Sequence, residues 1–235
     1  MSKFHRVVIK ISGEALAGEK KTGFDFDLIS TVCAVLKKAS EAGVQIGIVI
    51  GGGNFWRGVK DGAGKVERVN ADRMGMLATC MNCIAVCDVL RQLGAKARVM
   101  TAVDIMGVGE RYDTRRAIEY LEAGEIVLFA GGSGAPFFST DTAAALRAAE
   151  IHADAILLAK NIDGVYSADP RKDASAVKFD SISYDEVLAR RLAVMDTTAT
   201  AIAMENGIPA AVFALADPEN ILRVLNGEAV GTLVK

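Results

Sequence analysis

Proline and cysteine are scarce in this sequence, and each scarcity excludes a class of structure. The 235 residues include only four prolines and four cysteines. Proline is excluded from helix and sheet interiors, so its scarcity fits a core built from both. Four cysteines, three of them close together, do not make the disulfide framework of a small secreted domain. Because 51% of the residues are hydrophobic, we expect a sizeable buried core rather than disorder.

An excess of one charge and long apolar runs are also missing. The 27 Lys and Arg nearly cancel the 29 Asp and Glu, so nothing general favours nucleic acid or an anionic membrane as a partner. Mean hydropathy is +0.27. However, the longest uncharged stretches, residues 74–87 and 126–140, are shorter than the about 18–20 residues that cross a bilayer. Lys10 interrupts the only apolar run near the start, so no signal peptide is predicted. We expect a soluble, cytoplasmic protein.

Glycine is abundant, with 23 residues, and short apolar runs alternate with segments of helical periodicity. This alternation is typical of βαβ units and a parallel sheet. Gly43, Gly94, Gly124 and Gly207 each stand between a helical segment and the next strand, where a left-handed residue ends a helix. We therefore predict one continuous α/β domain: a three-layer α/β/α sandwich around a mostly parallel twisted sheet. The predicted strands are residues 6–10, 44–50, 97–101, 126–130, 155–159 and 210–213.

The loops between these elements are less regular. Residues 27–42 are predicted to be a helix, with apolar side chains at helical spacing. Residues 59–69 carry glycines and scattered charges and are predicted to be an exposed loop, and residues 160–182 are predicted to be irregular. A new helix is predicted after Ser183, because Ser183 and Glu186 form a capping box.

Three glycine-containing loops follow predicted strands, and we expect the chemistry there. They are residues 10–14, residues 51–58 and residues 131–141. Ligands of open α/β sheets bind at the carboxyl ends of the strands. Glycine lets the backbone approach an anion and direct N–H groups at it. One such loop alone is as often a simple turn. Three of them, two carrying a cation (Lys10 and Arg57), predict a polyanionic substrate and two phosphate-bearing ligands that face each other.

Two common nucleotide fingerprints are absent. No stretch matches the G-x-x-x-x-G-K-[ST] of a P-loop. A dinucleotide-binding site requires G-x-G-x-x-G, but the first loop reads Ser-Gly-Glu-Ala-Leu-Ala-Gly, and Trp56 stands where the second loop needs its last glycine.

These segments, in this order, resemble the bacterial UMP kinases of the amino acid kinase family along essentially the whole chain. The most specific stretches are Ala-Asp-Arg-Met-Gly-Met-Leu-Ala-Thr at 71–79 and Asp-Gly-Val-Tyr-Ser-Ala-Asp-Pro at 163–170. Residues 10–16, 51–58, 136–141 and 194–196 complete the resemblance. It implies the amino acid kinase fold and transfer of the ATP γ-phosphoryl group to UMP, giving UDP for pyrimidine and CTP biosynthesis. It also implies one domain, 1–235, with UMP binding and oligomerisation in residues 1–140 and ATP binding in residues 141–235.

The resemblance also implies site residues. The catalytic residues are expected to be Lys10, Arg57 and Asp141. The ATP site is expected to comprise Lys10, Ile11, Ser12, Gly13, Gly53, Arg57, Lys160, Asn161, Tyr166 and Asp169. The UMP site is expected to comprise Gly52, Asp72, Ser133, Gly134, Ala135, Pro136, Phe137, Phe138, Ser139 and Thr140. Ala135 stands where the family usually has asparagine, so one polar contact near UMP is expected to be lost. Residues 160–161 lie in a segment that varies in length and residue type in the family, so either Lys160 or Asn161 could contact the adenosine.

Regulation and assembly follow from the same resemblance. UTP is expected to inhibit, and a homohexamer built from dimers is expected. No direct protein ligand to a metal is expected, because Mg²⁺ enters with ATP through its phosphates. GTP is expected to activate the enzyme at Gly18, Glu19, Lys20, Lys21, Thr22 and Gly23, with Arg91 and Arg98 near the same effector.

A mechanism follows from the residue types. Phosphoryl transfer needs in-line positioning and neutralised oxygen charge. Lys10 suits the β- and γ-phosphates as a point charge, and the planar Arg57 suits a phosphate held at two oxygens. Asp141 either orients Lys10 or holds Mg²⁺ through water. The acceptor phosphate is largely dianionic, since its second pKa is about 6, so no general base is needed. His5 and His152 lie outside the three loops.

Several residues carry more than one interpretation. Cys80, Cys83 and Cys87 could hold a metal, but they share one helical face with no fourth ligand nearby, and we favour a buried core role. Trp56 either stacks on a base or packs beside Arg57 or at a subunit contact. Pattern alone leaves Asp72 as either a helix-terminal charge or a ligand contact, and the resemblance assigns it to UMP.

Asp196 is predicted to be a helix N-cap rather than a catalytic group, and residues 111–116 are predicted to be a solvated face. The acceptor of the reaction is a separate question. Within the same fold, a small carboxylate or carbamate could replace UMP, or the protein could be a non-catalytic nucleotide-binding oligomer. The presence of Lys10, Arg57, Asp72 and Asp141 counts against a non-catalytic protein.

Overall fold

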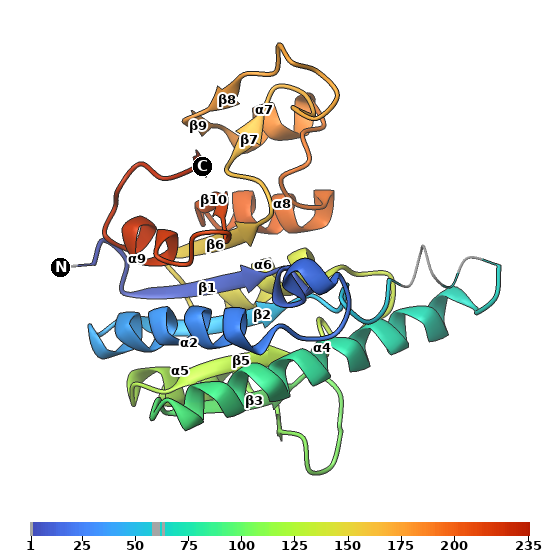
Figure 1. The fold of residues 1–235 in the computed structure, drawn as a ribbon, viewed down its shortest axis with the longest axis vertical. Helices are drawn as coiled ribbons and strands as arrows, with labels where there is room; N and C mark the ends of the chain where they lie inside the picture. Colours follow the sequence, from blue (N-terminus) through green and yellow to red (C-terminus); the bar gives the residue numbers. More distant parts are fainter. Residues whose placement is uncertain (1, 58–61, 63) are drawn as a thin grey trace.

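One twisted sheet runs through the chain in the computed structural model, which describes residues 2–57, 62 and 64–235 (Figure 1). Its nine strands lie in the order β4-β3-β5-β2-β1-β6-β10-β11-β9. Neighbouring strands are parallel except β10 and β11. The strands are β1 Arg6–Ile11, β2 Gln45–Ile50, β3 Ala97–Thr101, β4 Glu110–Arg111, β5 Ile126–Ala130, β6 Ala155–Lys160, β9 Ser181–Ile182, β10 Ala210–Ala214 and β11 Thr232–Val234.

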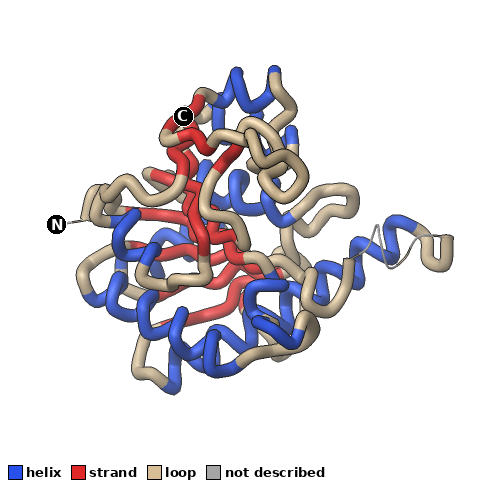
Figure 2. The backbone as a smooth tube through the Cα atoms, turned by 45° about the horizontal axis from the view of Figure 1, so that its top comes forward, coloured by secondary structure: helices blue, strands red, loops and turns tan. Residues whose placement is uncertain are grey.

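Helices cover both faces of this sheet. The helices of one core cluster, α1, α2, α4 and α9, pack on one face, and those of the other, α5, α6, α7 and α8, on the opposite face (Figure 2). The predicted three-layer α/β/α architecture is therefore confirmed. Their bounds are α1 Gly13–Leu16, α2 Phe26–Glu41, α4 Arg68–Gln92, α5 Thr114–Glu122, α6 Thr140–Glu150, α7 Tyr184–Ala189, α8 Thr197–Glu205 and α9 Asn220–Leu225.

The alternation of side chains along the central strand β1 decides which face each residue serves. Val7, Ile9 and Ile11 belong to the core beneath α2 and α4, whereas Val8 belongs to the core beneath α6. Because successive side chains of a strand point to opposite faces, Lys10 shares the face of Val8. The register of β1 thus directs this lysine toward α6.

The predicted strands are all present, and their bounds differ from the prediction by one residue or none. Gly43, Gly94, Gly124 and Gly207 have φ between 64° and 92°, which confirms their role as left-handed helix ends. The hydroxyl of Ser183 accepts a hydrogen bond from the Glu186 N–H, which confirms the predicted cap.

The differences concern short or buried elements. The stretch predicted to be irregular contains β9 and the hairpin of β7 Val165–Tyr166 and β8 Lys178–Phe179. Strands of two residues are too short to show periodicity. The predicted loop 59–69 is wrong at its end, because α4 begins at Arg68. Residues 58–61 and 63, including Gly58 of the second glycine loop, lie outside the described residues.

Helix α4 is the element that most resembles a membrane span. Within the described ranges it is the one helix long and apolar enough to cross a bilayer, but half of its apolar window is buried in the protein. Its inner face packs on the sheet through Cys80, Cys83 and Cys87, which are buried and unpaired. Burial raises the pKa of the Cys83 thiol. The core interpretation of these cysteines is confirmed.

Candidate active site

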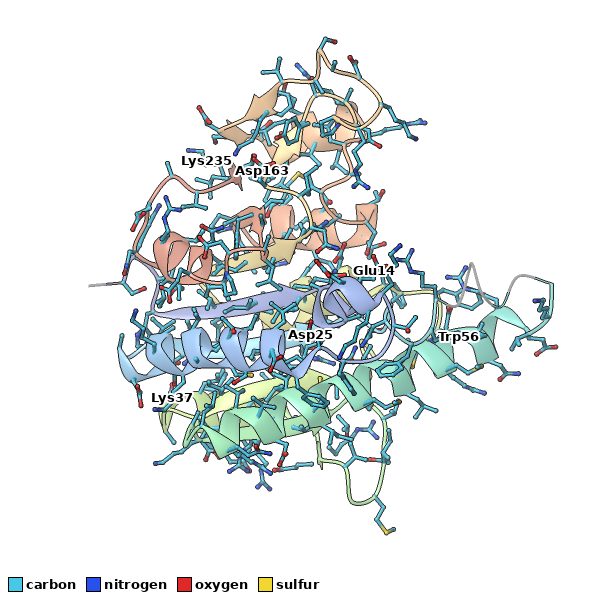
Figure 3. The ribbon with its side chains drawn as sticks, in the orientation of Figure 1. Glu14, Asp25, Lys37, Trp56, Asp163 and Lys235 are labelled. Atoms are coloured by element: carbon cyan, nitrogen blue, oxygen red, sulfur yellow. The ribbon has the colours of Figure 1, made fainter. Side chains whose placement is uncertain are left out.

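The three glycine loops line one cavity of about 370 Å³ at the carboxyl ends of β1, β2 and β5. Figure 3 labels Glu14 and Trp56 at this end of the molecule, and Lys37 and Lys235 toward the other. Parallel strands with helices starting behind them create this position. The predicted residues that line the cavity are Lys10, Ser12, Gly13, Gly52, Gly53, Arg57, Asp72, Ser133, Ala135, Phe138, Ser139 and Thr140.

Lys10, which lines this cavity, forms an ion pair with Asp141, which lies behind the lining residues. Lys10 Nζ lies 2.8 Å from Asp141 Oδ1, and the two side chains are only 11% and 17% exposed. Asp141 is the second residue of α6, and the hydroxyl of Ser139 caps that helix by accepting hydrogen bonds from the N–H groups of Asp141 and Thr142. Apart from the ion pair, the buried Asp141 Oδ1 accepts no hydrogen bond within the described ranges.

Lys160 belongs to the same charged group. It ends β6, which pairs with β1, and its Nζ donates a hydrogen bond to the Val194 carbonyl. Burial lowers the pKa of Lys160; the charge of Lys10 lowers it further, while the charges of Asp141 and Asp196 raise it. Leu158 of β6 pairs with Lys10 of β1, so Lys160, two residues further along, is on the same face of the sheet as Lys10. Its expected contact with adenosine stays a prediction.

Arg57 and Trp56 fix the second glycine loop from two sides. The guanidinium of Arg57 forms an ion pair with the carboxylate of Glu14, the first-loop residue after Gly13. The Trp56 indole N–H donates a 2.8 Å hydrogen bond to the Ala71 carbonyl in α4. Trp56 thus packs against α4 and also lines the cavity.

Asp72 ties α4 to the third loop. It lies beyond the first turn of α4 and accepts hydrogen bonds from the Phe137 N–H at 2.8 Å and from Arg68 Nε at 2.8 Å. Phe137 has φ 72°, a left-handed conformation that is costly for an aromatic residue. The Asp72 carboxylate therefore holds a strained loop in place. Of the residues predicted for UMP, Gly134, Pro136 and Phe137 do not line the cavity.

The remaining residues predicted for ATP do not line this cavity. The side chain of Ile11 is buried in the core, so it offers only backbone groups. Asn161 lines a cavity of about 280 Å³ shared with Glu14 and Gly18. Tyr166 and Asp169 line another, of about 420 Å³, with Arg171 and Arg190.

The residues predicted for GTP do not meet within one chain. Residues 18–23 follow α1, beyond the carboxyl end of β1, and the Gly23 N–H donates to the Asn54 carbonyl. Arg91 is in the last turn of α4 and Arg98 near the start of β3, at the opposite end of the parallel sheet. Arg98 forms an ion pair with Glu125 and stacks over Tyr120 at 3.4 Å.

Sequence reasoning missed several residues of the site. Gly75, Met76 and Thr79 line the cavity from α4, and Thr79 Oγ1 accepts a hydrogen bond from the Gly131 N–H. Their spacing from Asp72 (i+3, i+4 and i+7) is the signal that marks one helical face. Glu14 carried no signal, because its partner Arg57 is distant in sequence.

Asp196 does more than the predicted cap. Its carboxylate accepts the Ala199 N–H, which confirms the N-cap of α8, and it also accepts the hydroxyls of Ser139 and Thr142. Burial alone would raise the pKa of Asp196, but the hydrogen bonds from Ser139, Ala199 and Thr142 outweigh it and lower the pKa. The start of α6, which carries Asp141, is thereby joined to α8.

Comparisons with known proteins identify the family of the whole chain. The model of the amino acid kinase family matches residues 5–214. A uridylate kinase from Limosilactobacillus reuteri is 52% identical over 99% of this chain and 98% of its own length. The crystal structure of UMP kinase from Bacillus anthracis superposes with a TM-score of 0.95 at 37% identity, covering 99% of this chain and 96% of that one. The UMP kinase structure from Ureaplasma parvum has a TM-score of 0.92 at 35% identity, covering 98% of each chain.

Proposed function

This chain belongs to the amino acid kinase family, and we propose that it is a UMP kinase, which transfers the γ-phosphoryl group of ATP to UMP and releases UDP. The observation that carries the proposal is the cavity where three glycine loops, Lys10 and Asp72 meet. Relatives named uridylate kinase and UMP kinase support UMP as the acceptor. UDP formation places the reaction in pyrimidine nucleotide biosynthesis, upstream of CTP.

Lys10 supplies positive charge in the wall of the cavity, and Lys160 is on the same face of the sheet behind it. Asp141 forms an ion pair with Lys10 and, by its charge, raises the pKa of Lys160, so its negative charge offsets part of the repulsion between the two ammonium groups. Charge spread over the oxygens of the transferred phosphoryl group is stabilised by such fixed cations. The three side chains form a positively charged base for the phosphates.

Arg57 is proposed to bind a phosphate from the opposite wall. Its guanidinium is held by Glu14, which also lines the cavity, and its planar fork suits two phosphate oxygens. The acceptor is a phosphate that is largely ionised at neutral pH, with a second pKa of about 6. No side chain is needed as a base.

The donor set fits Mg²⁺ bound mainly through the nucleotide. In the part of the chain that the structure describes, no three His, Cys, Asp or Glu side chains group as a metal cage. Among the described residues, Asp141 Oδ1 is engaged only by Lys10, and this carboxylate is proposed to accept a hydrogen bond from a metal-bound water when the nucleotide is present. Mg²⁺ binds through one or two carboxylates plus substrate phosphates. When bound, it neutralises charge on the phosphoryl group.

The two nucleotides are assigned to the two halves of the chain. UMP is proposed to lie against Asp72 and the 133–140 loop, in residues 1–140. The adenosine of ATP is proposed to extend along residues 141–235 toward the cavity that Tyr166 and Asp169 line. The glycine loops would then hold both sets of phosphates between the halves.

Self-association and regulation belong to the same proposal. The outer face of α4 exposes Met74, Leu77, Met81 and Ile84, a continuous apolar stripe that suits burial against another subunit. This supports the homo-oligomer, proposed to be a hexamer, with UTP as inhibitor. Because residues 18–23 and Arg98 lie at opposite ends of one chain, a GTP that touched both would bind between subunits.

An assay of ADP release across acceptors tests the function. We expect UMP to give the highest kcat/KM, at least about 100-fold above CMP or AMP, because polar groups built for one base reject another. Carbamate and N-acetylglutamate, as small acceptors, should give no turnover. Equal turnover of CMP or AMP, or transfer to a small carboxylate, would contradict the proposal.

A further inference from the structure

Two asparagines, Asn54 and Asn82, form a buried amide pair beneath the second glycine loop. Asn54 follows the three glycines of that loop, and Asn82 lies on the inner face of α4. The residues are 1% and 0% exposed. Asn54 Nδ2 donates to Asn82 Oδ1 at 2.9 Å, and Asn82 Nδ2 donates to Asn54 Oδ1 at 2.8 Å. Each amide thus bonds the other twice, as in a cyclic amide dimer.

The second N–H of each amide holds a backbone carbonyl. Asn82 Nδ2 donates to the Gly51 carbonyl at 2.6 Å, and Asn54 Nδ2 donates to the Gly23 carbonyl at 2.8 Å. Both amide groups therefore use both N–H donors. Rotating either amide would place an oxygen against a carbonyl, so the network has one orientation.

The Gly51 carbonyl is the contact that reaches the site. In a planar trans peptide the C=O and the next N–H point in opposite directions. Holding the Gly51 carbonyl toward Asn82 therefore directs the Gly52 N–H away from α4's buried face. Gly51, Gly52 and Gly53 all line the phosphate cavity. The amide pair thus fixes the orientation of a backbone donor in a loop assigned to phosphates.

The pair also meets the first glycine loop. A Cβ on Gly13 would come within 2.7 Å of Asn54 Oδ1 and 2.2 Å of the Gly51 carbonyl, so Gly13 packs directly on both groups. The backbone carbonyl of Asn54 in turn accepts the Gly23 N–H at 3.1 Å. One buried pair therefore touches two phosphate loops, α4 and the 18–23 turn.

We propose that Asn54 and Asn82 are positioning residues for phosphoryl transfer, a role that rests on the proposed kinase function. They act through the Gly51–Gly52 peptide and touch neither nucleotide. A preorganised donor stabilises the transition state more than the ground state. Loss of the pair should therefore lower kcat and leave nucleotide binding nearly unchanged.

Two serine variants test this role. Asn82→Ser and Asn54→Ser each remove one amide but keep a small neutral side chain. We expect kcat to fall about 10- to 100-fold, as for a misplaced transition-state donor, while KM for UMP and ATP stays within about threefold. The double variant should lose little more than the worse single variant, because residues that act as a unit are not additive.

A matched control is Asn206→Ser. Asn206 is an exposed residue at the end of α8, and its amide donates a single hydrogen bond to the Ile202 carbonyl. It should keep wild-type kcat. Thermal unfolding in the assay buffer gives the folded fraction of each variant, so that kcat is expressed per folded molecule and loss of fold cannot imitate the effect.

The outcomes separate the two proposals. Wild-type protein that forms no UDP overturns the kinase function. Wild-type protein that forms UDP, with a folded Asn82→Ser or Asn54→Ser at wild-type kcat, overturns only the positioning role. A rise in KM that accounts for the whole loss also overturns it, because the pair would then serve binding rather than the transition state.

Discussion

Single side chains in this site mostly hold other groups in place. Asp141 holds Lys10, Glu14 holds Arg57, and Asp72 holds the backbone of Phe137. A charge held in advance costs little reorganisation when the phosphoryl group moves. The site contains few charged side chains, and each of Lys10, Arg57 and Asp72 is oriented by a partner of opposite charge. A local arrangement of this kind explains how a protein of net charge −2 can bind two phosphate-rich ligands.

The carboxylate of Asp196 makes the free energy of unfolding depend on pH. Its pKa is lowered in the folded state, so it contributes stability that is present above the ordinary Asp pKa of about 3.9 and is lost as pH falls through the folded value. Asp196→Asn removes that contribution but keeps a residue that caps helices well. We expect the variant to be less stable than wild type at pH 7, and the difference to shrink by pH 3.

Urea unfolding at pH 7, 5 and 3 measures this difference. The free energy of unfolding of wild type should fall more steeply with acid than that of Asp196→Asn. A difference that stays constant across the three pH values would contradict the assigned role of the Asp196 carboxylate.

At the scale of elements, the two first glycine loops are in van der Waals contact. A Cβ on Gly13 would come within 2.2 Å of the Gly51 carbonyl, whereas a Cβ on Gly75 in α4 would meet only Trp56, at 3.9 Å. Gly13→Ala should therefore lower the free energy of unfolding by about 1–3 kcal/mol through overpacking. Gly75→Ala should raise it by about 0.5–1 kcal/mol, because alanine favours a helix interior.

Chemical denaturation of the two variants checks this contrast. Opposite signs are expected from the same substitution. Equal effects would mean that the close approach of the loops is not what Gly13 provides.

Helix α4 has an inner face that packs on the sheet and an outer apolar face. Leu77 and Ile84 are 52% and 43% exposed in the single chain. If this face is buried between subunits, the double variant Leu77→Glu/Ile84→Glu should dissociate the oligomer, because two unpaired carboxylates would be buried. Sedimentation velocity measures the assembly. Lys38→Glu, a charge change on α2 at a side chain that is 69% exposed, is the control and should leave assembly unchanged.

An oligomer of unchanged mass in the double variant would contradict this assignment of the α4 face. A monomeric wild-type protein would contradict it as well.

At the scale of the whole molecule, the sequence predicted most of the fold. The central strands are mostly apolar, and four of them, β2, β3, β5 and β10, follow a helix-ending glycine, so periodicity and these glycines were enough to place them. The hairpin β7–β8 and the edge strands β4 and β9 have two residues each, and pairing over such short lengths depends on tertiary contacts. The start of α4 was also missed, because its first residues are polar.

The site was predicted where neighbouring residues act together and missed where distant ones meet. The glycine loops converge because they follow adjacent parallel strands, which the alternation of elements already indicated. The pairs Arg57–Glu14 and Asn54–Asn82 join segments far apart in sequence. The placement of Lys160 on the same sheet face as Lys10 depends on the pairing of β6 with β1, which a single sequence does not specify.

Transfer of the γ-phosphoryl group from ATP to UMP is proposed to depend most strongly on the charge of Lys10. The most direct measurement is the rate of UDP formation by Lys10→Met, with Lys38→Met as control, since the Lys38 side chain is 69% exposed on α2. We predict that Lys10→Met loses at least about 100-fold in kcat, the effect of removing a transition-state charge, and that Lys38→Met matches wild type. UDP formation by Lys10→Met at the wild-type rate would contradict the account.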